Sequence, residues 1–171
     1  MSGEPLSLPI EPLTKAAFAP FGTVIEAEGA ERLSINQGTT ERFHALAQLD
    51  VGEDGGIPIL SIFKAQARAF PIQIVMMERH PLSSQAFFPL SFHDWLVVVS
   101  TQPHPKALRA FLARGDQGVQ YARGVWHHPL LVMQPQQDFL VADRAGSGDN
   151  LQEHWFSAGQ AAYLAHPRQT A

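Results

Sequence analysis

Residues 117–143 read QGVQYARGVWHHPLLVMQPQQDFLVAD, and this stretch decides the fold class. Short apolar runs alternate in it with glycine, proline and polar residues, and no run has the length of an ordinary helix. Runs of this length that are rich in Val, Tyr, Trp and Phe are typical of strands. The stretch therefore predicts four short strands, over residues 117–121, 125–128, 130–134 and 139–143.

The rest of the chain continues this pattern. Glycine and proline number 13 each, so turn residues separate most apolar segments. Further strands are predicted over residues 6–10, 21–25, 57–65, 72–78, 85–90 and 94–100, and residues 42–51 alternate loosely. Ten or more short strands indicate an all-β protein with a few short helices, built as an antiparallel barrel or sandwich. No repeat or linker divides the chain, so residues 1–171 are expected to form one domain.

Four segments are predicted outside the strand pattern. Thr14 has the side chain of a helix N-cap and predicts a short helix over residues 15–18. Residues 106–113 show helical spacing of apolar side chains, although a strand is an alternative. Residues 157–165 begin with the spacing of a capping box and are predicted to be a helix. Residues 26–32, EAEGAER, are expected to form a polar loop.

Composition excludes several classes of function. With 45% hydrophobic and 16% charged residues, the chain is neither disordered nor membrane-spanning. The absence of cysteine removes disulfides, thiolate metal sites and cysteine nucleophiles. A formal net charge of -4 argues against a nucleic-acid binder and against a polybasic membrane patch. The N-terminus lacks the pattern of a signal peptide, so a soluble, cytoplasmic protein is expected.

The first candidate site follows the strand predicted over residues 72–78. Glu78 and His80 are two residues apart, so both side chains lie on the same face of a strand. A carboxylate and an imidazole on one face of a barrel can bind a metal or exchange protons. The simpler alternative is a surface ion pair at the strand end, which would stabilise little. The same period turns Arg79 away from this face.

The second candidate site is the run YARGVWHHP, residues 121–129. Its adjacent histidines, His127 and His128, would face opposite sides of a strand, so only one is expected to reach an interior pocket. For each histidine the alternative to a functional role is that its polar atoms are satisfied in the core or that it is exposed to solvent. Asp143 and His44, which lie in two turn-like clusters, are secondary candidates.

The two main clusters together resemble the cupin pattern, whose second motif places a histidine three residues after a glycine. Glu78, His80 and Gln85 occupy the ligand positions of the first cupin motif, and Gly124 and His127 fit the second. Two of the usual ligands are replaced, and a glutamine carbonyl is a poor substitute for a carboxylate at a transition metal.

Longer runs resemble the ureidoglycolate lyase family of the allantoin pathway more closely. They follow the family's order and extend from about Pro9 to Phe156. The runs are INQG and ERFH, then ERHPLSSQAFFPL, GDQGVQYARGVWHHPL and DFLVADRAGSGDN. The resemblance implies a cupin-like antiparallel β-barrel and a homodimer. It also implies an enzyme that cleaves (S)-ureidoglycolate to glyoxylate and urea in purine catabolism.

The implied reaction is a carbon–nitrogen elimination that consumes no water. It needs a base for the substrate hydroxyl, an acid for the leaving nitrogen and a cation for the carboxylate. His80, His127 and Glu78 are the expected catalytic residues, and which is base and which is acid stays open. An arginine fork suits a carboxylate best. The expected substrate-binding residues are Arg42, Arg123, Arg144, Lys64 and Gln85.

No cofactor is expected to be obligatory, although the resemblance leaves room for a divalent metal such as nickel. The residues that could hold it are Glu78, His80, Gln85 and His127. Two other functions are alternatives: a cupin-type metal-dependent enzyme for another small acid or sugar, and a non-catalytic cupin that binds a metabolite. No basic or helix-turn-helix segment is present, which weakens a regulatory role. The expected partner is the small-molecule substrate, not nucleic acid or membrane.

Overall fold

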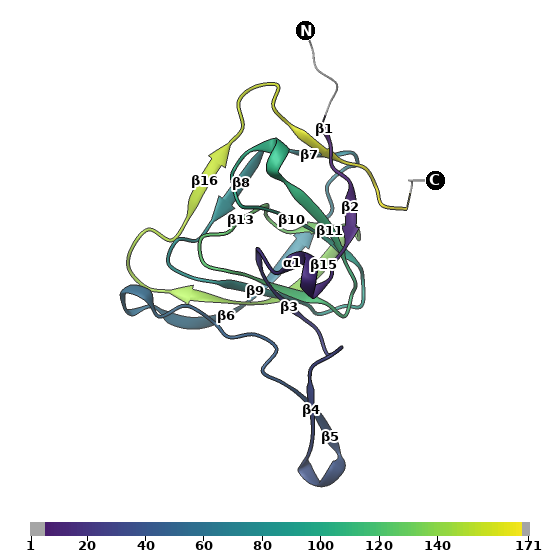
Figure 1. Cartoon of the computed structure of the whole chain (residues 1–171), viewed down its shortest axis with the longest axis vertical. Coiled ribbons are helices and arrows are strands. Elements are labelled where there is room, and N and C mark those ends of the chain that lie inside the picture. The colour runs from purple at the N-terminus through teal and green to yellow at the C-terminus, as the bar shows by residue number, and fades with distance from the viewer. Residues whose placement is uncertain (1–5, 169–171) are drawn as a thin grey trace.

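The structure is a computed structural model that describes residues 6–168, and these residues are mainly β-strands. Figure 1 shows one body, from which a hairpin of β4 (Glu31–Ile35) and β5 (Thr40–His44) projects. The described residues contain one α-helix, α1 (Lys15–Phe18), and three 3₁₀ turns at Asn36–Gly38, Glu53–Gly55 and Pro105–Ala107. Within this range no helix has the length and apolar character needed to cross a bilayer. The prediction of an all-β fold with a few short helices is confirmed.

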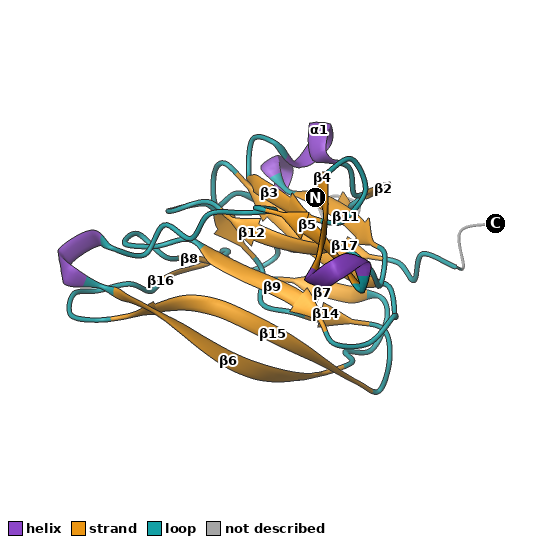
Figure 2. Ribbon diagram, turned by 90° about the horizontal axis from the view of Figure 1, so that it is seen from below, coloured by secondary structure: helices purple, strands orange, loops and turns teal. Residues whose placement is uncertain are grey.

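Two large sheets make up the body (Figure 2). The first sheet consists of β2 (Ile10–Pro12), β8 (Met76–Arg79), β10 (Trp95–Ser100), β11 (Arg109–Ala113), β13 (Trp126–His127), β14 (Leu131–Val132) and β16 (Gln152–Trp155). The second consists, in spatial order, of β3 (Gly22–Ile25), β12 (Gly118–Tyr121), β9 (Gln85–Pro89), β15 (Gln136–Ala145) and β6 (Ile57–Gln66). Among the described residues neither sheet closes on itself, and the arrangement is consistent with the cupin-like class.

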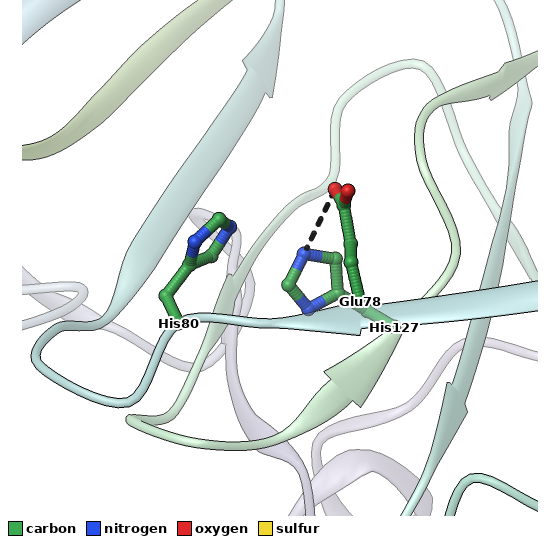
Figure 3. A group of neighbouring side chains, drawn as sticks. All are labelled: Glu78, His80 and His127. Atoms are coloured by element: carbon green, nitrogen blue, oxygen red, sulfur yellow. Dashed lines mark ion pairs between the residues drawn. The ribbon is translucent and has the colours of Figure 1, made fainter. Parts of the chain in front are cut away.

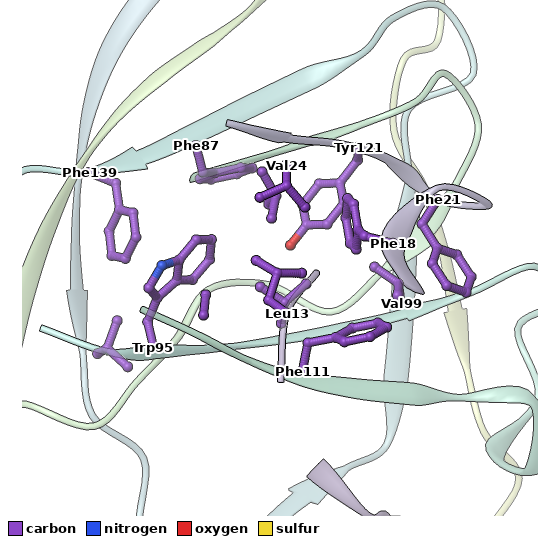
Figure 4. Close-up of a cluster of buried hydrophobic side chains, with 14 of the residues drawn as sticks. Leu13, Phe18, Phe21, Val24, Phe87, Trp95, Val99, Phe111, Tyr121 and Phe139 are labelled. Carbon is purple, nitrogen blue, oxygen red and sulfur yellow. The ribbon is translucent and has the colours of Figure 1, made fainter. Parts of the chain in front are cut away.

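An aromatic core lies between the two sheets (Figure 4). Trp95 on β10 contacts Phe139 on β15 with ring centroids 4.9 Å apart, and its Nε1 donates to the Gln117 carbonyl at 3.0 Å. Phe18 on α1 lies 5.9 Å from Phe111 on β11. Burying side chains of this size contributes roughly 1.5–3 kcal/mol each. The core therefore holds the two sheets in a fixed relation, and the candidate residues lie on these sheets.

A smaller sheet brings the two ends of the described chain together. It consists of β1 (Leu6–Ser7), β17 (Ala162–Leu164) and β7 (Ile72–Ile74). The prediction of a helix over residues 157–165 is wrong, because Ala162 and Leu164 are fully buried and pair with β7. The capping-box spacing instead closes a turn, in which the Gln160 amide donates to the Ser157 carbonyl at 2.9 Å.

Strand pairing between residues distant in the chain also determines the structure of other segments. Residues 106–113 form a 3₁₀ turn and then β11, because β11 lies between β10 and β2 and is buried on both faces. The helix over residues 15–18 is confirmed, and the Thr14 hydroxyl accepts from the Ala17 amide at 3.1 Å. The predicted polar loop over residues 26–32 runs into β4. The sequence does not predict β16, since all four of its side chains are exposed and show no apolar alternation.

Candidate active site

A cavity of about 390 Å³ is lined by four of the predicted site residues, Lys64, Glu78, Gln85 and His127. One wall comes from the end of β6 and the residues that follow it, and the opposite wall comes from β8 and β13. The polar and aromatic lining residues are Phe63, Lys64, Arg68, Glu78, Gln85, Phe87, Tyr121, His127 and His128. A cavity of this size suits a small polar molecule.

Three titratable side chains meet beside this cavity (Figure 3). β8 pairs with β13 so that Glu78 stands opposite His127, and the two-residue period of the strand adds His80 on the same side. One ligand atom from each residue lies within 4.8 Å of the others. Arg79 turns away, as predicted, and its Nε donates to Gln152 at 2.7 Å. The predicted grouping of Glu78, His80 and His127 is therefore present in the structure.

The tautomer of His127 follows from its contacts. Its Nδ1 lies 3.0 Å from the Val125 carbonyl, which can only accept, so Nδ1 carries the proton. Nε2 then has a free lone pair, is buried and has no hydrogen-bond partner. It lies 3.6 Å from a carboxylate oxygen of Glu78. The ring of Tyr121 stacks on the imidazole at 4.2 Å with an angle of 7°, which fixes the plane of the ring.

Burial and neighbouring charges set the protonation of this pair. Burial lowers the pKa of His127; the contact with Glu78 opposes this, and charge on His80 adds to it. Burial by itself would raise the pKa of Glu78, but the three neighbouring histidines bring it below its ordinary value. At neutral pH the cavity thus holds an ionised Glu78 beside a neutral His127.

His128 also lines the cavity, which corrects one prediction. The sequence predicts that the two histidines face opposite sides of a strand, but both line the same cavity and are 2% and 3% exposed. β13 ends at His127, so the alternation of a strand does not extend to His128, and Pro129 follows at once. Burial lowers the pKa of His128 to about 4, and the Arg68 cation contributes to this shift.

Gln85 connects His80 of the first candidate site to Asp143, one of the secondary candidates. Its Oε1 lies 2.9 Å from His80 Nε2, and its Nε2 donates to Asp143 Oδ2 at 3.1 Å. The other nitrogen of His80 lies 2.7 Å from the backbone carbonyl of Asn150. The secondary candidate Asp143 therefore joins the site, whereas His44 lines a separate cavity of about 400 Å³.

The hydrogen bonds limit what a metal ion could find here. Glu78, His80 and His127 have the spacing of a metal-binding group. The lone pair of His127 Nε2 is free, and the carboxylate of Glu78 faces it. Both nitrogens of His80, however, and the Oε1 of Gln85 already have partners. A metal would find two free protein ligands, whereas catalytic zinc sites use three. As arranged, these residues do not fit a resident metal ion.

Two cations line the cavity. Lys64 is one of the predicted carboxylate-binding residues, and its Nζ lies 3.4 Å from Asp138. Arg68 is not predicted from the sequence, because it follows β6 in a segment that carries no motif. Tyr121 is also missed as a site residue, although it opens the run that contains the histidines. A stacking aromatic ring has no signature in a single sequence beyond its place near a candidate residue.

The other predicted cations lie away from this cavity. Arg123 donates to the two carboxylate oxygens of Asp50, from Nη2 at 2.6 Å and from Nε at 3.0 Å. Its remaining nitrogen, Nη1, donates to Glu53 at 2.6 Å. Arg144 is buried and donates to backbone carbonyls. Arg42 lies on β5 in the projecting hairpin. Arg123 and Arg144 thus hold loops together, and neither lines the cavity within the described chain.

Comparison with known proteins identifies the family of this chain. A family model described as ureidoglycolate lyase matches residues 5–162. A protein of Brucella melitensis named ureidoglycolate lyase is 54% identical over 167 residues, which cover 96% of this chain and 98% of the relative. Proteins with the same name from Brucella anthropi and Burkholderia mallei are 56% and 53% identical, over 88% and 86% of this chain and 90% and 88% of theirs. The chain therefore belongs to the ureidoglycolate lyase family.

Proposed function

We propose that the protein is a ureidoglycolate lyase, which cleaves (S)-ureidoglycolate to glyoxylate and urea in the degradation of allantoin. The observation that carries the proposal is the buried, unpartnered Nε2 of His127, which faces Glu78 in a cavity of about 390 Å³. Membership of the family and the name shared by the relatives support the same reaction. The single-domain organisation and the cytoplasmic location stay predictions.

The chemistry of the substrate suits this arrangement. Ureidoglycolate carries a hydroxyl group and a urea nitrogen on the same carbon. Neutral His127 takes the hydroxyl proton through Nε2, the carbonyl forms as the carbon–nitrogen bond breaks, and the protonated ring returns the proton to the leaving nitrogen. Glu78, ionised and 3.6 Å from Nε2, stabilises the transient imidazolium. Glyoxylate and urea are the products, and no water is consumed.

The cations of the cavity support binding of the substrate carboxylate. Lys64 and Gln85 are the two predicted substrate-binding residues that line the cavity. The Nζ of Lys64 already has Asp138 at 3.4 Å, whereas Arg68 makes no ion pair within residues 6–168. A guanidinium also matches a carboxylate with two parallel hydrogen bonds. We therefore place the substrate carboxylate at Arg68, with Lys64 as the neighbouring positive charge.

The first prediction tests this reaction. Purified protein given racemic ureidoglycolate should release glyoxylate and urea in equal amounts, without ammonia, because elimination splits the molecule at one bond. The rate should change by less than about twofold with EDTA, since the side chains themselves supply the proton transfer. Glyoxylate is measured by reduction with a coupled dehydrogenase, and urea by a separate urease assay.

The other outcomes would each change the conclusion. Activity that is lost with EDTA and restored by nickel or manganese would show that a divalent metal is required and would contradict proton transfer by the side chains alone. Binding of ureidoglycolate without turnover would favour a metabolite-binding cupin. If the protein neither bound ureidoglycolate nor released glyoxylate from it, the proposed function would be contradicted.

We also propose a homodimer that forms along β6. This strand ends the second sheet, so one of its edges has no neighbouring strand within the described chain. Its large apolar side chains are exposed, with Leu60 at 69%, Ile57 at 59% and Ile62 at 55%. Leu140, exposed at 38% and paired with Ile62, extends the face of Leu60 and Ile62 onto β15, whereas Ile57 lies on the other face of β6. A long apolar edge favours pairing with another strand, and two copies of one edge can pair about a two-fold axis.

The second prediction concerns this interface. Ile62→Lys should convert a dimer to a monomer in size-exclusion chromatography with light scattering, because a charge on the exposed apolar strand opposes its burial. Phe92→Lys is the matched control, since Phe92 is 90% exposed in a loop that is not part of β6, and it should leave the dimer intact. A wild-type monomer at all concentrations, or a dimer in both variants, would contradict an interface at β6.

A further inference from the structure

Both ring nitrogens of His80 face oxygen atoms that can only accept hydrogen bonds. Nδ1 lies 2.7 Å from the backbone carbonyl oxygen of Asn150, and Nε2 lies 2.9 Å from Oε1 of Gln85. A neutral imidazole has one N–H and can donate to only one of these oxygens. An imidazolium has two and satisfies both. The short contacts on both sides therefore match the doubly protonated ring.

The doubly protonated form of His80 requires that the oxygen of the Gln85 amide faces the ring. The contact of Gln85 with Asp143 sets this orientation. The Gln85 NH₂ group donates to Asp143 Oδ2 at 3.1 Å, which turns Oε1 toward His80. The reversed amide would set an oxygen against the carboxylate. The reversed amide is satisfied only if Asp143 carries a proton on Oδ2, and His80 is then neutral. With Asp143 as a carboxylate, Oδ2 accepts from Gln85 while Oδ1 stays buried without a partner.

The Asn150 carbonyl, which faces Nδ1 of His80, is also fixed in position by hydrogen bonds. The side chain of Asn150 accepts from the Leu82 amide at 2.8 Å and donates to Ser83 at 2.9 Å. These bonds tie the loop that carries the Asn150 carbonyl to the turn that follows His80. The carbonyl is thereby fixed against Nδ1, and the ring cannot rotate without losing both hydrogen bonds.

We propose that Asp143 and Gln85 are positioning residues that hold His80 protonated on both ring nitrogens, as a fixed cation beside Glu78 and His127. The inference rests on the proposed lyase function, and it separates the roles of the two histidines. His80 is neither the base nor a free metal ligand, and the neutral base is His127. The cation acts through its neighbours, because it favours an ionised Glu78 and disfavours a second positive charge on His127.

The charged neighbours of His80 come from each strand packed around it. Glu78 on β8 and His127 on β13 stand on its cavity side. Asp143 on β15 reaches it through Gln85 on β9. Arg79, next to it in the chain, turns away and lies 4.6 Å over the ring of Trp126. One carboxylate thus lies beside the ring and a second lies behind Gln85, which suits a positive charge in a partly buried place.

The third prediction concerns variants that remove the carboxylate of Asp143 and then restore a carboxylate at position 85. Asp143→Asn should lower kcat roughly 10–100-fold with little change in KM, the range known for loss of the outer hydrogen-bond partners that orient metal-bound histidines. The double variant Gln85→Glu/Asp143→Asn exchanges the two groups, so that the carboxylate introduced at position 85 accepts both from His80 and from the amide introduced at position 143. It should recover most of the wild-type kcat. Asp116→Asn, which removes a surface carboxylate paired with Arg114, should have no effect.

A spectroscopic measurement separates this inference from the function itself. Nitrogen-15 spectra of the histidine rings at neutral pH, assigned with a His80→Gln variant, should show both nitrogens of His80 protonated in the wild type and in the exchanged double variant. In Asp143→Asn the ring should become neutral. A neutral His80 in the wild type, or a double variant as slow as Asp143→Asn, would overturn the inference. Failure of wild-type turnover with a doubly protonated His80 would contradict the proposed function alone.

Discussion

His127→Asn is expected to lower kcat/KM for ureidoglycolate about 10²- to 10⁴-fold, the contribution typical of a proton-transferring side chain. The asparagine amide can keep the hydrogen bond that His127 Nδ1 makes to the Val125 carbonyl at 3.0 Å, so the fold should persist. It has no group that exchanges a proton near neutral pH, and the lone pair that faces Glu78 at 3.6 Å is lost. The loss should appear mainly in kcat.

His128→Asn is the matched control for this variant. It makes the same chemical change one residue further along, in a side chain that lines the same cavity. The Nδ1 of His128 bonds to the Pro129 carbonyl at 2.8 Å, and its ring does not face Glu78 at ion-pair distance. Glyoxylate release by this control should stay within about tenfold of the wild type. Equal losses in the two variants would mean that His127 has no special part in proton transfer.

The parts of the site that are predicted correctly depend on local geometry. Glu78 and His80 share a face because a strand repeats every two residues, and this needs no knowledge of the rest of the fold. The same rule is wrong for His127 and His128, because β13 is only two residues long and the proline after them ends it. A periodicity predicts orientation only as far as the element that carries it extends.

The cations could not be assigned from the sequence because their partners are distant along the chain. Arg123 is bonded to Asp50 and Glu53, about seventy residues earlier, and these contacts use its whole fork. Arg68 lines the cavity only because the end of β6 comes to lie opposite β13. Asp143 is a secondary candidate in the sequence, and the pairing of β15 with β9 is what brings it to Gln85. Contacts of this kind are fixed by sheet register.

Gly22→Ala is the second substitution with a large expected effect, and it acts on the frame behind the site. Gly22 on β3 pairs with Tyr121 on β12, the residue whose ring stacks on His127. Its φ is +151°, and a Cβ built there would lie 1.9 Å from the backbone oxygen of Gln120. A backbone oxygen cannot move aside as a flexible side chain can, so β3 would have to separate from β12.

This variant should therefore lower the free energy of unfolding by about 4 kcal/mol, the sum of backbone strain and of overpacking against a fixed neighbour. Urea unfolding followed by tryptophan fluorescence measures the loss, with an unchanged m-value showing that the transition stays two-state. Gly159→Ala is the control, because Gly159 has a φ of +82° but open space around its Cβ position, and it should cost only about 1 kcal/mol. Equal losses would show that the close approach of β3 to β12 adds nothing beyond the backbone angle. A loss specific to Gly22, accompanied by slower glyoxylate release in the folded fraction, would connect the glycine through Tyr121 to the orientation of the catalytic imidazole.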